Sequence, residues 1–226
     1  MGQYAYPMAQ QRTMGRPARL SRDAICNAAL ELLATDGAGD FSLRALGIRL
    51  GVDPTAIYRH FSDKDDLLRE VGDRGLAPVV KGFRTTSDPR DDIRKLCTRL
   101  RTTLLKNQVA LGLTSSGPTR RPNELRITEI MLGSLSRCGL SEEEAVVAYH
   151  ALIEYTLGSA ALDAPLAAPG ADRQGTYRSW RSDYAELIED EYPASRAHAK
   201  KLYPPSDRVF SAGLNALITG LTTSEE

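Results

Sequence analysis

Residues 41–64 read FSLRALGIRLGVDPTAIYRHFSDK, and this stretch decides the fold. Ser42 is a favourable N-cap for a first short helix, and Gly51 at its other end tolerates the left-handed backbone with which many helices finish. Asp53 then caps a second helix, which we predict over residues 53–61. Two short helices joined by a tight glycine turn are typical of a helix-turn-helix unit, whose second helix enters the major groove of DNA.

Each of these predicted helices has an apolar side that would face a core. Leu43, Leu46 and Leu50 recur at helical spacing in the first helix. Ile57 and Phe61 lie four positions apart in the second. The remaining side chains of the second helix are therefore left on other faces, where they can point outward.

The same stretch resembles a known family. LRALGIRLGV followed by TAIYRHFSDKDDLL is similar to the DNA-binding segment of the TetR family, the tetracycline-repressor-like bacterial regulators, and the YRHF run at 58–61 with Lys64 after it is the distinctive part. Gly47 departs from the family, which usually has alanine there, although both residues are small enough to let two helices cross closely. The resemblance covers about residues 16–71 and implies a DNA-binding transcriptional regulator.

The resemblance also implies which residues contact DNA. Arg44 can reach a base edge or a phosphate, and arginine is the side chain best shaped for a bidentate contact with guanine. Thr55 and Ala56 open the recognition helix, where base contacts concentrate. The residues expected to contact DNA are Arg44, Thr55, Ala56, Tyr58, Arg59, His60 and Lys64.

Three of these residues correspond to family positions that hold backbone phosphates: Tyr58, His60 and Lys64. Lys64 also lies at a helix N-terminus, which itself favours anions. Tyr58 and His60 could instead pack beside Phe61. Arg59 is compatible with a DNA contact and equally with a solvated position.

Composition is that of a soluble, helix-rich protein of one or two domains, with 226 residues, 42% hydrophobic and 6% aromatic. No apolar run approaches the length of a membrane span, and the three cysteines are too far apart for a local metal or redox motif. We therefore expect a cytoplasmic protein with no cofactor, no metal and no membrane partner.

The net charge is zero, but residues 1–22 carry arginines and no acidic residue. They form either a solvated tail or an arm that orders against DNA phosphates.

We predict an all-α chain, because it shows no βαβ alternation and no strand-rich region. Residues 1–14 are expected to be a disordered extension, residues 15–66 a three-helix helix-turn-helix DNA-binding module, and residues 67–222 a larger helical domain for ligand binding and dimerisation. The first helix of the module is predicted over 21–35, ended by the glycine turn at 37–39.

The larger domain is predicted as a series of helices. One begins at residue 62 or 63 and carries Gly75 and Pro78, so we expect a kink or a break near Ala77. Further helices are predicted over 91–112, 123–138 and 142–162, with loops at 115–122 and 163–175. The helix over 142–162 is apolar almost all round, which indicates the buried centre of the domain.

Two apolar stripes near the C-terminus are candidates for a subunit interface. One stripe comprises Tyr177, Trp180, Tyr184, Leu187 and Ile188, and the other comprises Phe210, Leu214, Leu217, Ile218 and Leu221. The resemblance implies that the last two long helices of each subunit pack as a four-helix homodimer interface. Either stripe could instead belong to the core of its own chain.

Polar residues within the apolar helix at 142–162 are candidates for a small-molecule site. His150 and Glu154 lie four apart and face the same way, so they could line a pocket or could pair as a structural element. The candidate ligand-binding residues are Leu100, Leu104, Met131, Tyr149, His150, Glu154 and Trp180, and the apolar ones among them are equally compatible with plain core.

Other classes of function are less well supported by the sequence. An enzyme would need catalytic machinery, but we find no nucleophile elbow, no metal-spaced cluster and no phosphate-binding loop. A helical interaction module that no longer binds DNA would have no use for Tyr58 and Lys64 in this arrangement. We therefore expect no catalytic residues. We expect a repressor that binds an operator as a homodimer and is released by an unknown small-molecule effector.

Overall fold

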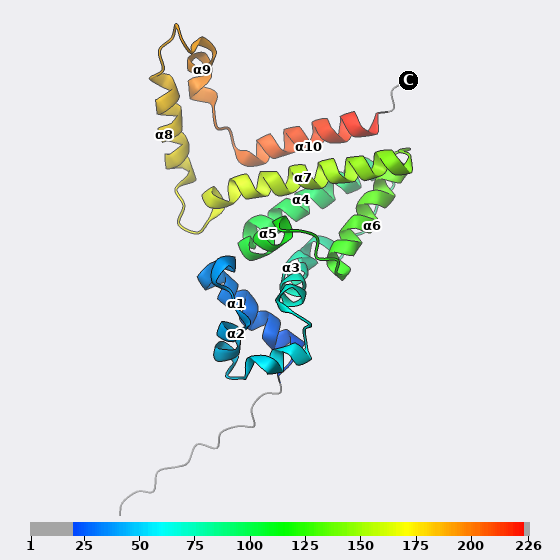
Figure 1. Ribbon diagram of the computed structural model, residues 1–226. Coiled ribbons are helices and arrows are strands. Elements are labelled where there is room, and N and C mark those ends of the chain that lie inside the picture. Colours follow the sequence, from blue (N-terminus) through cyan, green and yellow to red (C-terminus); the bar gives the residue numbers. More distant parts are fainter. Residues whose placement is uncertain (1–19, 224–226) are drawn as a thin grey trace, which may run out of the picture.

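The computed structural model describes residues 20–223, and in this part of the chain the predicted all-α class is confirmed (Figure 1). The predicted extension over residues 1–14 lies outside the described residues. The elements are α1 (Arg22–Asp40), α2 (Leu43–Leu50), the 3-10 helix η1 (Pro54–Arg59), α3 (Lys64–Val80), α4 (Pro89–Lys106), α5 (Gln108–Ser115), α6 (Pro122–Arg137), α7 (Glu142–Ala167), α8 (Arg173–Ala185), α9 (Pro193–His198), the 3-10 helix η2 (Ala199–Lys201) and α10 (Ser206–Thr222).

The helix-turn-helix unit begins and ends where its local signals predicted. The Ser42 hydroxyl accepts the N–H of Ala45, and Gly51 closes α2 with φ at 66°. The helix predicted over 53–61 is present as the shorter 3-10 helix η1, with Asp53 as its N-cap. The N–H of His60 bonds to the carbonyl of Ile57, three residues back, which is the tighter pattern common in short helical pieces.

Helix α1 is longer than predicted, since it continues through the glycine turn expected at 37–39 to Asp40. Glycine inside a helix costs about 1 kcal/mol, but it does not by itself end the helix. Ile57 and Phe61 are buried as predicted, in a core that α1, α2, η1 and the first half of α3 share.

Helix α3 belongs to two hydrophobic cores. Leu67 and Val71 pack in the core of the DNA-binding module, whereas Leu76 and Val79 pack in the core of the larger domain. Of the kink or break predicted near Ala77, the break is wrong, because α3 runs through Pro78 to Val80. The guanidinium of Arg99 on α4 donates to the carbonyls of Pro78 and Lys81, both at 2.8 Å, and so stabilises this end of the helix.

The single helix predicted over 91–112 is two helices, because α4 ends and α5 begins at Asn107. The Asn107 side chain accepts the N–H of Ala110 and thereby caps α5. Helix α5 crosses α3 closely at Gly75, where a Cβ atom would lie only 2.4 Å from the Cβ of Ala110.

Helix α7 is longer and less buried than predicted. It extends to Ala167, which shortens the second predicted loop. Its inner face packs against α4, α6 and α10, but its outer face is exposed, with Val147 62% and Leu162 84% accessible. Length and composition alone would allow α7 to cross a membrane, but a core helix of a soluble protein meets the same criteria.

Helices α8 and α9 project from the body as an arm, and α10 returns along α7 (Figure 1). Phe210, Leu214 and Ile218 of the second predicted interface stripe are buried against their own chain, so this stripe is core and the opposite face of α10 is exposed. In the first stripe, the Tyr177 ring is buried and stacks on Tyr203 with 5.7 Å between centroids. Much of the first stripe therefore also packs within the chain.

A buried ion cluster connects α4, α7, α8 and α10. Arg101 is only 3% exposed, and its guanidinium contacts Asp163 at 2.8 Å and Asp207 at 2.6 Å. Arg173 at the start of α8 contacts the second oxygen of Asp163 at 2.6 Å. The cluster fixes the base of the arm and the start of α10 to the body of the domain.

Candidate nucleic-acid interface and ligand pocket

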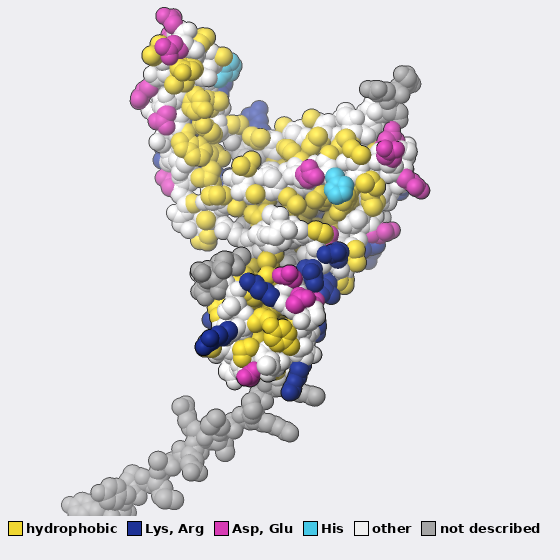
Figure 2. All heavy atoms as spheres, in the orientation of Figure 1, with side chains coloured by type: hydrophobic (Ala, Val, Ile, Leu, Met, Phe, Trp, Pro, Cys, Tyr) yellow, Lys and Arg dark blue, Asp and Glu magenta, His cyan; other side chains and the backbone are white. Residues whose placement is uncertain are grey.

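The predicted DNA-contacting residues gather on the outer side of α2 and η1. Arg44, Thr55, Tyr58 and Arg59 are exposed, with Tyr58 54% accessible. Ala56, His60 and Lys64 are half-buried. Lysine and arginine side chains are also visible at this end of the molecule in Figure 2.

Asp53 organises the start of η1. One carboxylate oxygen accepts both the Thr55 hydroxyl, at 2.6 Å, and the Thr55 N–H, at 2.8 Å. These two hydrogen bonds, the hydroxyl first, lower the pKa of Asp53 below its ordinary value. Thr55 is therefore held in one orientation at the exposed tip of the unit.

Lys64 has an internal contact that the sequence did not indicate. Its ammonium donates to the carbonyl of Phe41 at 2.6 Å and lies 5.4 Å from the centre of the Phe41 ring. An ammonium has three donors, so a second bond to a phosphate remains chemically available. Lys64 thus joins the end of α1 to the start of α3.

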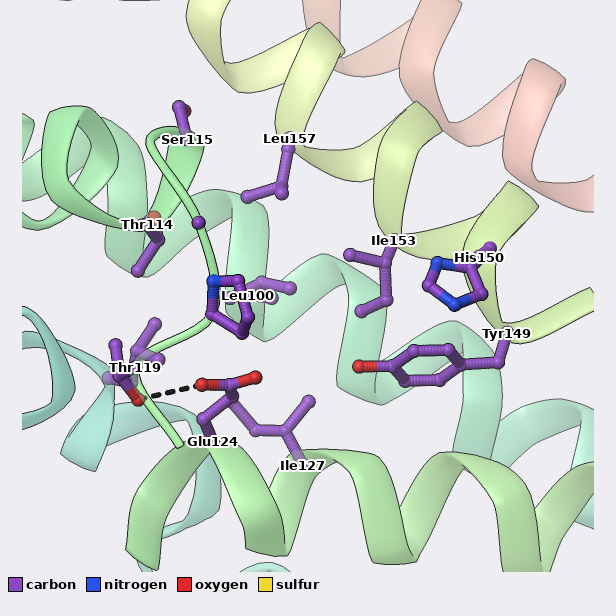
Figure 3. Close-up of a pocket in the computed structure, with 13 residues that line it drawn as sticks. Leu100, Thr114, Ser115, Thr119, Glu124, Ile127, Tyr149, His150, Ile153 and Leu157 are labelled. Atoms are coloured by element: carbon purple, nitrogen blue, oxygen red, sulfur yellow. Dashed lines mark hydrogen bonds between the residues drawn. The ribbon is translucent and has the colours of Figure 1, made fainter. Parts of the chain in front are cut away.

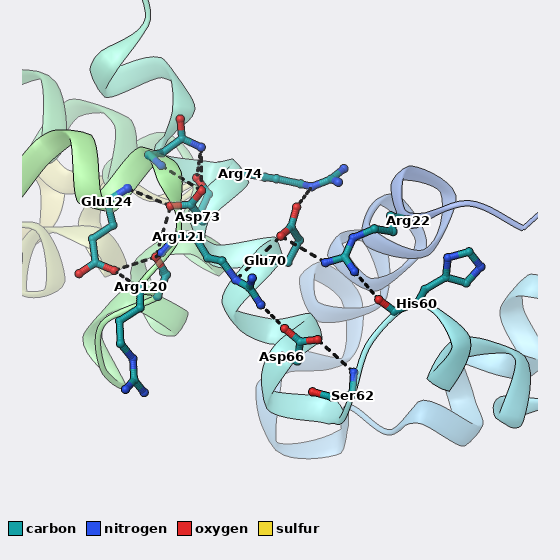
Figure 4. Close-up of polar contacts among 12 residues, drawn as sticks. Arg22, His60, Ser62, Asp66, Glu70, Asp73, Arg74, Arg120, Arg121 and Glu124 are labelled. Carbon is teal, nitrogen blue, oxygen red and sulfur yellow. Dashed lines mark hydrogen bonds and ion pairs between the residues drawn. The ribbon is translucent and has the colours of Figure 1, made fainter.

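A polar network connects the DNA-binding module to the larger domain through α3 (Figure 4). Arg22 on α1 donates to the backbone carbonyl of His60, lies 4.1 Å above the Phe61 ring and faces Glu70 at 3.5 Å. Arg121, at the N-terminus of α6, pairs with Asp66 and comes within 4.0 Å of Glu70. The start of α3 is therefore held from both sides by arginines of other helices.

The first turn of α6 is fixed to α3 by a buried carboxylate. Asp73 is 4% exposed and accepts the backbone N–H groups of Asn123, at 3.2 Å, and Glu124, at 2.9 Å. It also accepts the Asn123 side-chain amide at 2.9 Å. A displacement of this end of α6 would therefore break these hydrogen bonds or move α3 with it.

The larger domain contains a mostly apolar cavity of about 240 Å³ between α4, α6, α7 and the loop after α5 (Figure 3). Leu100, Ile127, Ile153 and Leu157 form much of its wall. Its polar lining residues are Thr114, Ser115, Thr119, Glu124, Tyr149 and His150.

The structure divides the predicted ligand-binding residues among three places. Leu100, Tyr149 and His150 line the cavity of Figure 3. Glu154 and Trp180 instead line a second, more open pocket of about 650 Å³ between α7, the arm and the start of α10. Leu104 and Met131 are fully buried in the core and line neither pocket.

The alternative pairing of His150 with Glu154 is not present either, since no hydrogen bond or ion pair joins these two described side chains. The Tyr149 hydroxyl instead lies 3.0 Å from the Thr128 hydroxyl on α6. The Tyr149 and His150 rings meet edge to face, with 5.1 Å between their centres.

Thr119 and Glu124 are pocket residues that we did not predict from the sequence. The carboxylate of Glu124 accepts the Thr119 hydroxyl and the Arg120 N–H through one oxygen, both at 2.7 Å. A signal did exist, because Glu124 is the third residue of a helix that begins with Pro122, the position from which a glutamate reaches back to the preceding backbone.

Two models of one protein family match the two parts of the chain. Residues 25–71 match bacterial regulatory proteins of the tetR family, and residues 84–224 match the tetracyclin repressor-like C-terminal domain. The chain is 30% identical over 218 residues to an HTH-type transcriptional regulator of Saccharopolyspora erythraea, covering 96% of this chain and 90% of that protein.

Solved structures give the same result. The transcriptional regulator SCO7222, a TetR from Streptomyces coelicolor, is 29% identical and superposes with a TM-score of 0.76, over 90% of this chain and 98% of that chain. The Streptomyces coelicolor protein ActR, in complex with actinorhodin, has a TM-score of 0.78 at 24% identity, over 90% of this chain and 97% of that chain. The latter likeness concerns the fold alone.

Proposed function

The chain belongs to the TetR family of bacterial transcriptional regulators, and on this premise we propose that it is a cytoplasmic repressor that binds a palindromic operator as a homodimer and is released by a small molecule. The observation that carries the proposal is the outward face of α2 and η1. There, Arg44, Thr55, Tyr58 and Arg59 are exposed around the buried Ile57.

In this proposal, Thr55 and Ala56 meet base edges, and Arg44 reaches a base or a phosphate. Tyr58, His60 and Lys64 hold the backbone, and Arg59 adds a further contact. Phosphate contacts fix the position of the protein, whereas base contacts select the sequence. Two copies of η1 would enter successive major grooves, so the half-sites of the operator are expected about 34 Å apart or at a multiple of this spacing.

The dimer is proposed to form through the outer faces of α7 and α10, the two longest of the last helices. Both faces carry small or apolar exposed residues: Val147, Gly158, Ala161 and Leu162 on α7, and Val209, Ala212, Ala216 and Gly220 on α10. Figure 2 shows hydrophobic side chains spread over this side of the molecule. A continuous exposed apolar surface of this kind favours association with another protein surface.

The cavity of Figure 3 is proposed as the effector site. It combines apolar walls with a few polar groups, and the similar fold of ActR accommodates actinorhodin. Effector binding would favour a conformation in which the two copies of η1 no longer match successive grooves. Helix α3 is the element that would transmit the change, because both cores include it.

The proposal is tested by measuring binding of the purified protein to DNA from upstream of its own gene, by fluorescence anisotropy over a range of salt concentrations. Lys64→Ala should weaken binding to all duplexes and reduce the slope of log affinity against log salt by about 1. Arg44→Ala should reduce discrimination between operator and unrelated DNA more than it reduces the salt slope. A protein that binds operator and unrelated duplexes equally would refute the proposed function.

A further inference from the structure

Among the residues that the structure describes, Glu124 supplies the only carboxylate in the wall of the cavity of Figure 3, and no lysine or arginine belongs to that wall. One carboxylate oxygen of Glu124 accepts hydrogen bonds from the Thr119 hydroxyl and the Arg120 N–H. The other oxygen has no hydrogen bond within the described residues and points toward the cavity (Figure 3). An acceptor with an open lone pair in apolar surroundings favours a ligand that brings an N–H or O–H donor. An anionic ligand would find repulsion there and no cation to compensate it.

The same carboxylate holds a strained turn. Arg120 has φ at 54°, in the left-handed region that residues with a side chain seldom occupy. Its N–H is bonded to Glu124. The neighbouring residue, Arg121, is the one that pairs with Asp66 at the start of α3 (Figure 4). Glu124 therefore stabilises a backbone conformation on which the position of Arg121 depends.

We propose that Glu124 is the residue that senses the effector, and that the effector is a small apolar molecule with an amine or hydroxyl donor rather than an anion. This inference rests on the proposed function and specifies the chemistry of the same site. A donor bound to the inward oxygen draws the carboxylate toward the cavity and weakens its bonds to Thr119 and Arg120. The strained turn then relaxes, and Arg121 loosens its contact with Asp66.

The ligand class is tested without DNA, using three compact probes that differ only in the polar group: phenethylamine, 2-phenylethanol and phenylacetate. Calorimetry on the full-length protein should show that the amine and the alcohol bind, the amine more tightly, and that phenylacetate binds at least about tenfold more weakly than the amine. Glu124→Gln should weaken the amine by about tenfold or more, since hydrogen bonds to charged groups contribute about 1.5–3 kcal/mol. Glu129→Gln, on the exposed side of α6, is the matched control and should bind as the wild type does.

The sensing step is tested by hydrogen exchange, which reports the backbone directly. Phenethylamine should accelerate exchange of the Arg120 amide in the wild-type protein, and Glu124→Ala should do so without any probe, whereas Glu129→Ala should not. Thermal unfolding establishes that each variant is folded.

Three results would overturn the inference: phenylacetate binding as tightly as phenethylamine, Glu124→Gln retaining the wild-type amine affinity, or none of the probes binding at millimolar concentration. Failure of the proposed function gives a different result, the absence of specific DNA binding, which these probe measurements do not involve.

Discussion

The crossing of α3 and α5 at Gly75 predicts the effect of a single added methyl group. In Gly75→Ala, the new Cβ would lie 2.4 Å from the Cβ of Ala110 and 3.0 Å from the side-chain nitrogen of Asn107. Non-bonded carbon atoms prefer a separation of about 3.5–4.0 Å, so the two helices must separate by about 1 Å at this point. Overpacking of this kind costs about 1–3 kcal/mol, and alanine recovers about 1 kcal/mol of helix propensity.

The net expectation for Gly75→Ala is a loss of about 1 kcal/mol, which corresponds to a decrease in Tm of about 2–4 °C for a chain of this size. Gly133→Ala on α6 is the matched control, because a Cβ there meets nothing within 4 Å. This control should gain about 1 kcal/mol from propensity alone. The difference between the two variants isolates the cost of the overlap.

Thermal unfolding followed by circular dichroism, at one fixed protein concentration, measures both variants. Because Gly75 lies on the helix shared by the two cores, Gly75→Ala should also change DNA affinity, while Gly133→Ala should leave it unaltered. If Gly75→Ala stabilised the protein as much as Gly133→Ala does, then α3 and α5 would not be in the close contact described here.

Three further variants probe the ion cluster, the acid dependence of stability and the dimer. Asp163→Ala leaves the buried Arg101 with the exposed Asp207 as its one remaining carboxylate, beside the Ser159 hydroxyl, and should cost about 3–5 kcal/mol of unfolding free energy, measured by urea denaturation. Burial raises the pKa of Asp92, but hydrogen bonds, that of Arg137 first, outweigh it and hold the pKa below its ordinary value. Asp92 therefore stabilises the fold above its unfolded pKa of about 3.9, and the advantage over Asp92→Asn should shrink as the pH falls below that value. Ala216→Arg places a charge in the outer face of α10 and, if the proposed dimer forms there, should convert it to a monomer in light scattering.

Each of these three variants has a control, a similar substitution at an exposed position. Asp207→Ala removes the exposed partner of the ion cluster and should cost clearly less than Asp163→Ala. Asp190→Asn changes an exposed carboxylate and should leave the acid dependence of stability intact. Leu125→Arg introduces a charge on the exposed side of α6 and should leave the dimer unchanged. Equal effects of a variant and its control would contradict the corresponding assignment.

Short-range signals predicted the fold well where one residue determines the local backbone. The cap at Ser42 and the turn at Gly51 depend on neighbouring atoms only, and both are confirmed. The same reasoning failed for the break predicted near Ala77, because α3 continues through Pro78, and Arg99, distant in sequence, stabilises the C-terminal end of the helix. It also failed at Asn107, which caps a new helix inside a long apolar pattern.

For the candidate functional residues, too, local patterns were informative, whereas contacts between distant helices were not predicted. Periodicity identified the apolar side of α10 but not its partner, so it left open whether Phe210 lies at a subunit interface or in the core, and the structure buries Phe210 in its own chain. Leu100 and Leu104 lie on one helix, and only the packing of α6 and α7 determines that the former reaches the cavity. Glu124 was missed as a pocket residue, because its place in the first turn of α6 indicates a bond to the preceding backbone but not that it lies beside a cavity.

The sharing of α3 between two cores limits how this regulator can be modified or recombined. Most multidomain proteins can be cut in an exposed linker, so that each part folds alone. Here a cut after residue 66 would remove Leu67 and Val71 from the DNA-binding module. A chimera that joins this DNA-reading unit to a foreign sensor should therefore be spliced beyond Val71, within the helix itself, and its sensor must accept the geometry that this helix imposes.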